Sequence, residues 1–360
     1  MKRLLPLCAI LLAACLLFGC HPKQTPAAAA SEAPTAEPTA EPTVEPTAAP
    51  TEAPVPGPIV EYDAKYRKLT VTGTGDYDLL QLPEDADEAV TLSVNDDDFT
   101  LSQWIPHLPL GDEPFSVFLP GFLSRTEQSF RFLRAYLSEN CGGLYPAERA
   151  ALPVSLKTSN YDFGYRVRDG RLELTDTDSC DYYHREWLYL LAMMDSRNIG
   201  WEQYGYAWYV GTCLDPYSES PRMFLASSPV FGEWPYKDIL QCANVNTETP
   251  TAADVRAFYD AVSRFCFELD LTGWGSACES RPVTAETFYA RADAEAKLQD
   301  ETLSAFMAAS LIGWLDKQYG PQTIAAFCFG QKTFEEAFDT DFDAAFAAWK
   351  AWIIETYPID

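Results

Sequence analysis

The sequence predicts an α+β fold, with a β-rich N-terminal part followed by a mostly α-helical C-terminal part. Residues 67–72 and 89–94 alternate apolar and polar side chains, as half-buried strands do. Residues 252–269 instead repeat apolar side chains at helical spacing, and residues 181–210 do so in two successive stretches. Strands first and helices later are typical of an α+β protein.

The first twenty residues resemble a bacterial lipoprotein signal peptide. A basic start is followed by an apolar run at residues 4–18, which is short for a membrane span. The run ends in the letters LFGC, which resemble a lipobox, and this resemblance implies that Cys20 is lipidated. We therefore expect a signal peptide at residues 1–20 and a protein anchored to the membrane by its N-terminal lipid, on the extracellular face. Ordinary secretion with cleavage elsewhere is the alternative.

Residues 21–58 are almost entirely Pro, Ala, Thr and Glu. Because this composition cannot bury a core, we expect a disordered, extended tether. At roughly 3 Å per residue it would reach about 110 Å, which suits a thick Gram-positive cell wall. We divide the globular remainder into a β-rich part with one helix at residues 59–170 and a helical part at residues 171–360.

The net charge of −27 argues against nucleic acid and anionic lipid as partners. It is compatible with cationic or neutral partners, and solubility alone explains it equally well. No cysteine after Cys20 forms a C-x-x-C motif, which argues against a zinc ribbon or a thioredoxin-type site. We expect most of these cysteines to be buried thiols, and one or two disulfides are the alternative. They are Cys141, Cys180, Cys213, Cys242, Cys266, Cys278 and Cys328.

Further elements are expected between the first strands and the helical part. Residues 116–119, 153–156 and 171–174 are strand-like, and residues 126–140 predict a helix that begins at a Thr126 cap. Residues 95–98, which read NDDD, predict a solvated turn. Calcium binding there is a weaker alternative, because an EF-hand also needs a Gly and a closing Glu.

The helical part is organised around residues 181–210. They predict two amphipathic helices joined by a short turn that ends at Gly200. The first helix carries Trp187 and Leu188 on its apolar face, and the second carries Trp201 and Tyr204.

These two helices resemble the core of the gluzincin, or peptidase-MA-like, metallopeptidases. In that family H-E-x-x-H on one helix supplies two zinc ligands and a general base, and the Glu of a following W-x-x-E-G-x-A-x-Y helix supplies the third ligand. Residues 201–209 read WEQYGYAWY, so Tyr204 stands at the third ligand position. Residues 184–188 read HREWL, so His184 is kept, Arg185 replaces the general base and Leu188 replaces the second His.

Three later patterns resemble the same family in the same order. They are residues 308–320, ended by Gly320 and Pro321, then residues 333–338 and residues 342–349. The resemblance covers about residues 172–357 and implies a zincin-like fold for the helical part.

The resemblance implies a peptidase scaffold whose zinc chemistry is missing. Leu188 cannot ligate a metal, Arg185 opposes a dication, and Tyr204 would ligate only as a phenolate. We therefore expect no catalytic residue, no metal ligand and no cofactor. The expected role is binding or interaction at the cell envelope, with a peptide or glycan as ligand and no nucleic acid.

Two alternatives stay open. One is an active zinc metallopeptidase with non-standard ligands. The other is a glycan-binding or glycoside-cleaving surface protein, because aromatic side chains crowd residues 182–209 and because Glu186 and Glu202 are candidates for an acid/base pair. Glu186 lies about 200° around the helix from His184, so we expect it to face solvent. We also expect core packing to account for most of the aromatic side chains.

Overall fold

The computed structural model describes residues 57–73, 76–105, 108, 113–159, 164–177, 185–194, 199–219, 225, 236–269, 284–286, 288 and 302–359. The chain divides into two compact units, Met1–Ala53 and Pro54–Asp360, and every described residue belongs to the second. Cys20, the tether up to residue 56 and His184 therefore lie outside the described residues.

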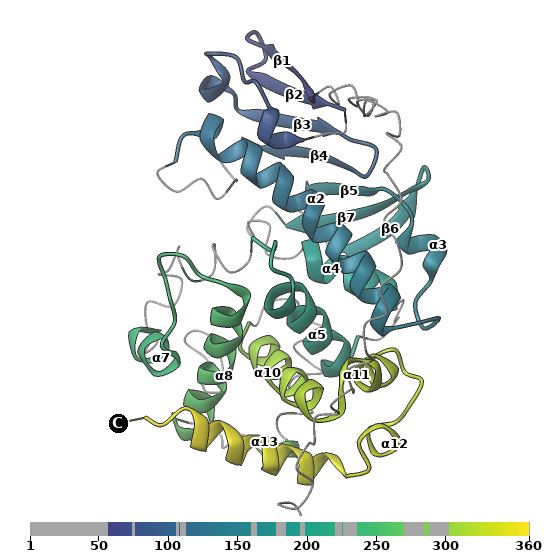
Figure 1. Cartoon of the computed structure of the whole chain (residues 1–360), viewed down its shortest axis with the longest axis vertical. Helices are drawn as coiled ribbons and strands as arrows, with labels where there is room; N and C mark the ends of the chain where they lie inside the picture. The colour runs from purple at the N-terminus through teal and green to yellow at the C-terminus, as the bar shows by residue number, and fades with distance from the viewer. Residues whose placement is uncertain are drawn as a thin grey trace, which may run out of the picture. The chain divides into compact units, whose positions relative to one another are not determined.

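The second unit is an α+β fold with a β-rich N-terminal part, as predicted. Its strands form a seven-stranded mixed sheet in the order β1-β2-β3-β4-β5-β7-β6 (Figure 1). The strands predicted near residues 67–72, 89–94, 153–156 and 171–174 are confirmed as β2, β3, β5 and β7, and the sheet continues across residue 171. The strand bounds are β1 (Ile59–Asp63), β2 (Lys68–Thr72), β3 (Thr91–Asn95), β4 (Phe99–Trp104), β5 (Val154–Ser159), β6 (Gly164–Arg168) and β7 (Arg171–Thr177).

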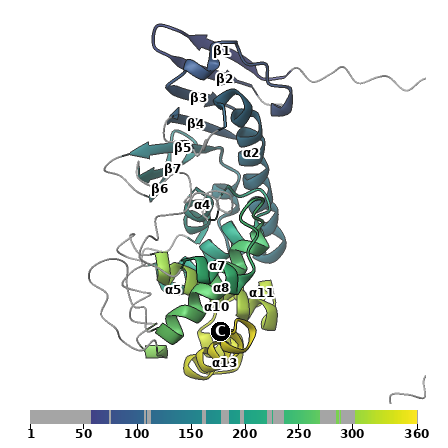
Figure 2. The same cartoon turned by 90° about the vertical axis from the view of Figure 1, so that its left-hand side faces the viewer.

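Alternation along the strands gives the sheet one apolar face. The register aligns Val71, Val94, Leu101, Leu156 and Leu174 in one row across β2, β3, β4, β5 and β7, and all five side chains are buried. Helix α2 (Phe115–Asn140) runs along this face (Figures 1 and 2). Burial of such apolar surface stabilises the fold by about 25 cal/mol per Å².

Helix α2 begins earlier than the sequence predicted. Residues 116–119, expected to form a strand, lie within the first five residues of this helix. Thr126, expected as the N-cap, lies in its middle, where its Oγ1 donates to the carbonyl oxygen of Phe122 at 2.7 Å. A run as short as residues 117–119 is compatible with either a buried strand or a buried helix, so its pattern could not separate the two.

The turn at residues 95–98 is not simply solvated. Asp96 is buried and accepts hydrogen bonds from the hydroxyl of Tyr77 at 2.6 Å and from the N–H of Asp98 at 2.7 Å. Tyr77 begins the short helix η1 (Tyr77–Leu79), which packs against α2. The partner of Asp96 therefore comes from an element 19 residues away, which the local turn composition does not encode.

Helices α4 (Arg185–Met194) and α5 (Trp201–Trp208) confirm the predicted helix pair. The chain continues from α5 directly into the π-helical segment η4 (Tyr209–Leu214). Helix α5 packs closely on α10 (Thr302–Tyr319) at Gly205. A Cβ on Gly205 would lie only 2.8 Å from the backbone of Ala308, so a larger residue would not fit there. The remaining elements are η2 (Ala86–Glu88), α3 (Ala147–Ala150), α7 (Tyr236–Ala243), α8 (Ala252–Leu269), α11 (Pro321–Cys328), α12 (Phe334–Phe338) and α13 (Phe342–Thr356).

The C-terminal patterns predicted from the sequence form helices. Residues 308–319 lie in α10, and Gly320 follows it with a φ of 83°, a conformation that favours glycine. A capping box starts α12, in which the Thr333 side chain accepts from the N–H of Glu336 and the Glu336 side chain accepts from the N–H of Thr333. Helix α13 follows and buries Trp349 completely.

Cys141, Cys213 and Cys328 are buried free thiols, as expected. Burial raises the pKa of Cys213 to about 12, so this thiol is not a reactive thiolate at neutral pH. Cys180 and Cys278 lie outside the described residues. Among the helices that the structure describes, none is both long and apolar enough to cross a membrane.

Candidate functional site

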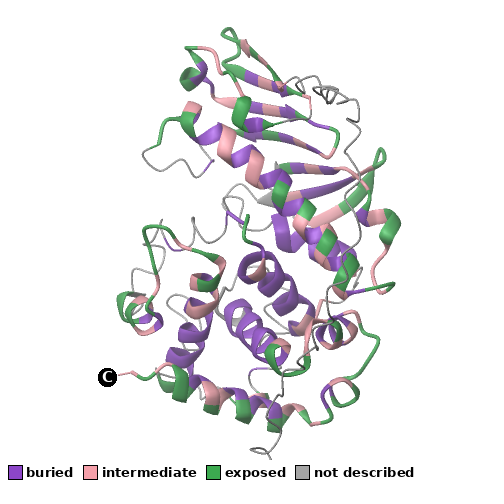
Figure 3. Cartoon of the chain, viewed as in Figure 1, coloured by how far each residue is buried: buried purple, intermediate pink, exposed green. Residues whose placement is uncertain are grey.

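The predicted cleft positions lie on α4 and α5, which pack against each other. The ring centroids of Trp187 and Tyr204 are 5.4 Å apart, and those of Trp187 and Trp208 are 6.2 Å apart. Every residue of α4 from Arg185 to Met193 is buried (Figure 3). Helix α4 is therefore a core helix and not the amphipathic helix that the sequence predicted.

None of the described cleft positions opens to solvent. Arg185 is 3% exposed, Leu188 1% and Tyr204 6%, whereas His184 lies outside the described residues. The described aromatic side chains of this region also belong to the core, as expected, and among them Trp201 also lines a cleft described below. The buried aromatic residues are Trp187, Trp201, Tyr204, Tyr206, Trp208 and Tyr209.

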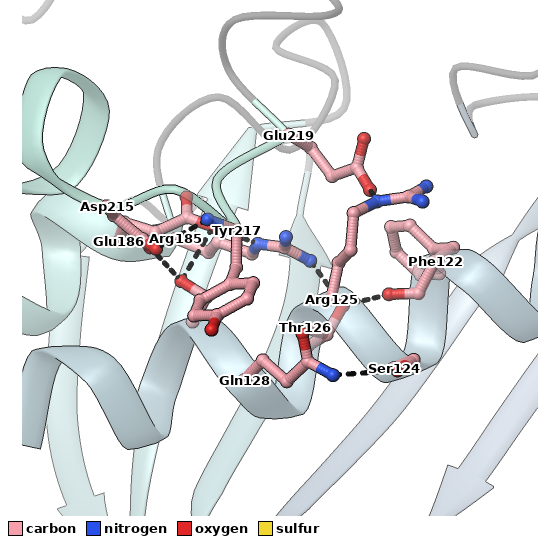
Figure 4. Close-up of polar contacts among 11 residues, drawn as sticks. Phe122, Ser124, Arg125, Thr126, Gln128, Arg185, Glu186, Asp215, Tyr217 and Glu219 are labelled. Carbon is pink, nitrogen blue, oxygen red and sulfur yellow. Dashed lines mark hydrogen bonds and ion pairs between the residues drawn. The ribbon is translucent and has the colours of Figure 1, made fainter. Parts of the chain in front are cut away.

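A buried polar network joins α4 to α2 (Figure 4). Arg185 Nε lies 2.5 Å from Glu186 Oε1, and Arg185 Nη1 donates to Thr126 Oγ1 at 2.7 Å. The hydroxyl of Ser129 lies 3.4 Å from Glu186 Oε1 and also hydrogen-bonds to Asp215. We call these five residues the α4 network.

The backbone around η4 places Asp215 in this network. Asp215 follows the π-helical segment directly, and the N–H of Tyr217 donates to its Oδ1 at 2.9 Å. Gly211 allows η4 to approach α4, because a Cβ there would lie 3.0 Å from the Cβ of Glu186.

A second ion pair lies beside the α4 network and extends toward the surface. It joins Arg125 of α2 to Glu219, whose side chain is 1% exposed, whereas 29% of the Arg125 side chain is exposed (Figure 4). The guanidinium of Arg185 also lies over the ring of Phe122, 5.4 Å from its centroid. The charge of Glu219 acts on Arg185 as well, so the two groups of charges are coupled.

Burial dominates the electrostatics of the α4 network. It raises the pKa of Glu186 to about 7, against the opposing effect of Arg185 and with a further upward contribution from Asp215. Burial also raises the pKa of Asp215 to about 6, although the hydrogen bond from Ser129 favours the charged form. The guanidinium of Arg185 thus faces two buried carboxyl groups. Glu186 and Asp215 therefore share a proton up to near-neutral pH.

Two atoms of the α4 network have no hydrogen-bond partner among the described residues. They are Arg185 Nη2 and Glu186 Oε2. Leaving one buried polar atom unpaired costs about 1–3 kcal/mol. Arg256 Nε and Asp316 Oδ1 also have no hydrogen-bond partner among the described residues, so this feature is not peculiar to the α4 network.

The sequence-based expectation that Glu186 faces solvent is wrong. Glu186 is 1% exposed, because α4 is covered on every side and because Arg185 compensates its charge. Sequence reasoning also missed Ser129 and Asp215, which lie 86 residues apart along the chain. The only local signal was the helical spacing of Thr126 and Ser129, and that spacing is common on surface helices.

The residues at the aligned zinc positions do not fit a zinc ion. Arg185 brings a fixed positive charge, Leu188 has no ligating atom, and the side chain of Tyr204 is buried among aromatic rings. Within the described ranges, no cluster of three or more His, Cys, Asp or Glu side chains is placed to hold a metal. We therefore derive no chemical step through zinc at these positions.

Glu186 and Glu202 are not brought together in one cleft. Glu202 lines a cleft of about 370 Å³ between α5 and the α11–α12 region, with Phe327 and Lys332 on the other side. Glu186 does not line this cleft and belongs to the α4 network. The geometry therefore does not support Glu186 and Glu202 as an acid/base pair.

A second cleft of about 400 Å³ lies between η1 and α2 and is lined mainly by polar side chains, among them Asp78 and Glu127.

No protein-family model, curated protein or solved structure matches the chain.

Proposed function

We propose that the chain is a lipid-anchored binding protein of the cell surface, built on a peptidase-MA-like scaffold without zinc chemistry. The position of Arg185 is the main support for the absence of zinc chemistry. It stands where the family has its general base, and it is 3% exposed and ion-paired with Glu186. A buried guanidinium that neutralises the adjacent carboxylate opposes both a dication and a catalytic base at this position.

The scaffold assignment is supported by motif order and element order together. Strand β7 precedes α4, and α5 packs on α4 with Gly205 in close contact with α10. The later patterns fall on α10, α12 and α13 in the expected sequence. Because no relative matches, this assignment depends on the residues of this chain alone.

The location is supported by the N-terminal 58 residues, with the lipobox-like letters before Cys20 and a Pro-rich stretch after it. A tether of this length would hold the globular part away from the membrane surface. That placement suits a protein that binds a component of the envelope.

The zinc content of the purified full chain tests the proposal. The chain is held in detergent, loaded with zinc and dialysed, and the metal is then measured by mass spectrometry. We expect almost no retained zinc and a melting temperature that a chelator does not change. Tightly held zinc that is lost in His184→Ala would refute the proposal.

A restored site tests the scaffold separately. The variant R185E/L188H/Y204E rebuilds the family motif around His184, and we expect it to retain about one zinc per chain. Y204E alone is the control and is expected to stay free of zinc. A restored variant that keeps its circular dichroism spectrum but binds no zinc would show that the scaffold assignment is wrong.

A further inference from the structure

The face of the sheet opposite α2 is polar and accessible. We call it the open face. The strand register places Thr70, Ser93 and Ser102 in one row that leads to Lys157. The residues of this row are half-buried or exposed, in contrast to the buried apolar row on the other face. A second, parallel row contains Thr72, Asn95, Thr100, Ser155, Glu173 and Arg166.

Cations gather at one corner of the open face, on β5, β6 and β7. We call Lys157, Arg166, Arg168 and Arg171 the basic corner, because the register places all four on the same face. Two carboxylates accompany them: Glu173 within the corner and Asp169, which lies 3.4 Å from Arg168 in the adjoining turn. The corner therefore has a surplus of cations, in a chain whose net charge is −27.

Glu173 holds two of these cations in fixed positions. It is 3% exposed and forms ion pairs with both Lys157 and Arg166. The two cationic side chains remain 44% and 55% exposed, so they can still meet a ligand. Because one carboxylate pairs with two cations, this group of three side chains has a net positive charge. An anionic ligand would complement that charge. Nη1 of Arg171 also has no hydrogen-bond partner among the described residues.

The rest of the open face favours a sugar chain over a compact anion. The two rows carry hydroxyl groups and one amide, which both donate and accept hydrogen bonds as sugar hydroxyls do. From β2 to β6 the rows extend about 24 Å, at about 4.8 Å per strand. Trp104 ends β4 on the same face and is 56% exposed, which offers an aromatic surface for a sugar ring.

We propose that the open face binds an acidic polysaccharide. The basic corner binds the anionic groups of the polysaccharide, and the hydroxyl rows and Trp104 contact the sugar rings. This inference depends on the proposed function only for the envelope as the place of binding. The site lies on the sheet and does not involve Arg185, Leu188 or Tyr204, so its test is separate from the zinc measurement.

Binding is measured with the full chain in detergent on immobilised polygalacturonate, with dextran, polyglutamate and single-stranded DNA as parallel surfaces. We expect retention on polygalacturonate that weakens as the salt rises from about 0.05 to about 0.5 M, because the contact is partly ionic. We expect little retention on neutral dextran or on the two polyanions without matching sugar rings. Equal retention on polyglutamate or DNA would overturn the proposal, because charge alone would then explain it.

Two variants and a matched control locate the site. Arg168→Glu is expected to lower the affinity about tenfold, since it reverses an exposed charge in the basic corner. Trp104→Ala is expected to lower it about fivefold through the lost ring contact. Lys332→Glu makes the same charge change at an exposed residue of the α11–α12 turn, and we expect no effect. Equal losses in K332E and R168E would overturn the proposal, as would retention on phosphatidylglycerol vesicles but not on polygalacturonate.

Discussion

Two buried polar networks flank η4, and they differ in how they balance charge. The α4 network sets Arg185 against the carboxyl groups of Glu186 and Asp215. The other network joins Tyr209, Arg256, Asp260, Ser310 and Asp316, and we call it the α8–α10 network. In it Arg256 donates to the hydroxyl of Tyr209 at 3.1 Å and to the carbonyl oxygen of Gly313 at 2.5 Å, and Lys317 acts as a second cation near Asp260.

The α8–α10 network balances its buried charges and connects three elements of the helical part. In the α8–α10 network Asp260 accepts from Ser310 at 2.5 Å and from Tyr357 at 3.1 Å, so it ties α8 to α10 and to the residue that follows α13. Two cations face two carboxylates there. The α4 network has one cation for two carboxyl groups. Both networks leave two buried polar atoms without a hydrogen bond among the described residues, so they differ in charge balance and not in unpaired atoms. The stability of the α4 network therefore depends on protonation.

The largest expected change in stability follows from removing the arginine of the α4 network, and removing the arginine of the α8–α10 network is the comparison. Arg185→Met leaves Glu186 and Asp215 buried without a cation, and we expect the free energy of unfolding to fall by about 3–5 kcal/mol at neutral pH. Arg256→Met is expected to cost only about 1–2 kcal/mol, because Asp260 keeps the hydroxyls of Ser310 and Tyr357. Urea unfolding of the two variants measures both values.

A double variant controls for simple misfolding. R185M/E186M replaces the pair by apolar side chains of similar volume, and it should recover most of the stability that R185M loses. If R256M lowered the free energy of unfolding as much as R185M, the charge imbalance of the α4 network would not affect stability.

The second prediction is a pH dependence of stability. The pKa values of Glu186 and Asp215 rise in the folded protein to about 7 and about 6, so the folded state binds protons more tightly than the unfolded state. Their stabilising contribution is complete below the unfolded pKa values near 4 and is lost as the pH rises through about 6 to 7. Urea unfolding between pH 5 and pH 8 should therefore show E186Q/D215N with a flatter decline than the wild type.

The control for this measurement removes two acidic groups that face solvent. E335Q/D343N changes the same number of charges at exposed positions of α12 and α13. It should keep the wild-type slope. A wild-type slope in E186Q/D215N would mean that the two buried carboxyl groups do not retain a proton near neutral pH.

The sequence predicted the sheet well, because strand alternation is a local property. Leu69 and Val71 of β2 alternate with polar residues and are buried as that pattern requires. The pattern failed at residues 116–119, where a short run with three apolar residues fits both a strand and α2. The fold was therefore predictable wherever a period of two or of 3.6 extended over enough residues.

The α4 network could not be predicted in the same way. Arg185 and Glu186 have the charged side chains of a surface helix, and their burial depends on partners far away in the chain. Thr126 lies 59 residues before Arg185, and the contact of Ser129 with Asp215 spans 86 residues. The motif alignment nevertheless pointed to α4 and α5, so the sequence located the region and missed the contacts that determine its chemistry.

The smallest expected effect compares one hydroxyl in each network. Ser129→Ala removes the hydrogen bond to Asp215 and should cost about 1 kcal/mol. This cost should grow from pH 5 to pH 8, because Asp215 becomes charged in that range and then needs the donor more. Ser310→Ala also loses the hydrogen bond from Trp349 Nε1, but its cost should change less between the two pH values, since Asp260 keeps the Tyr357 hydroxyl and the nearby Arg256. Urea unfolding at both pH values separates the two variants. If the cost of S129A is the same at both pH values, Ser129 serves only as a packing residue and Asp215 does not titrate in this range.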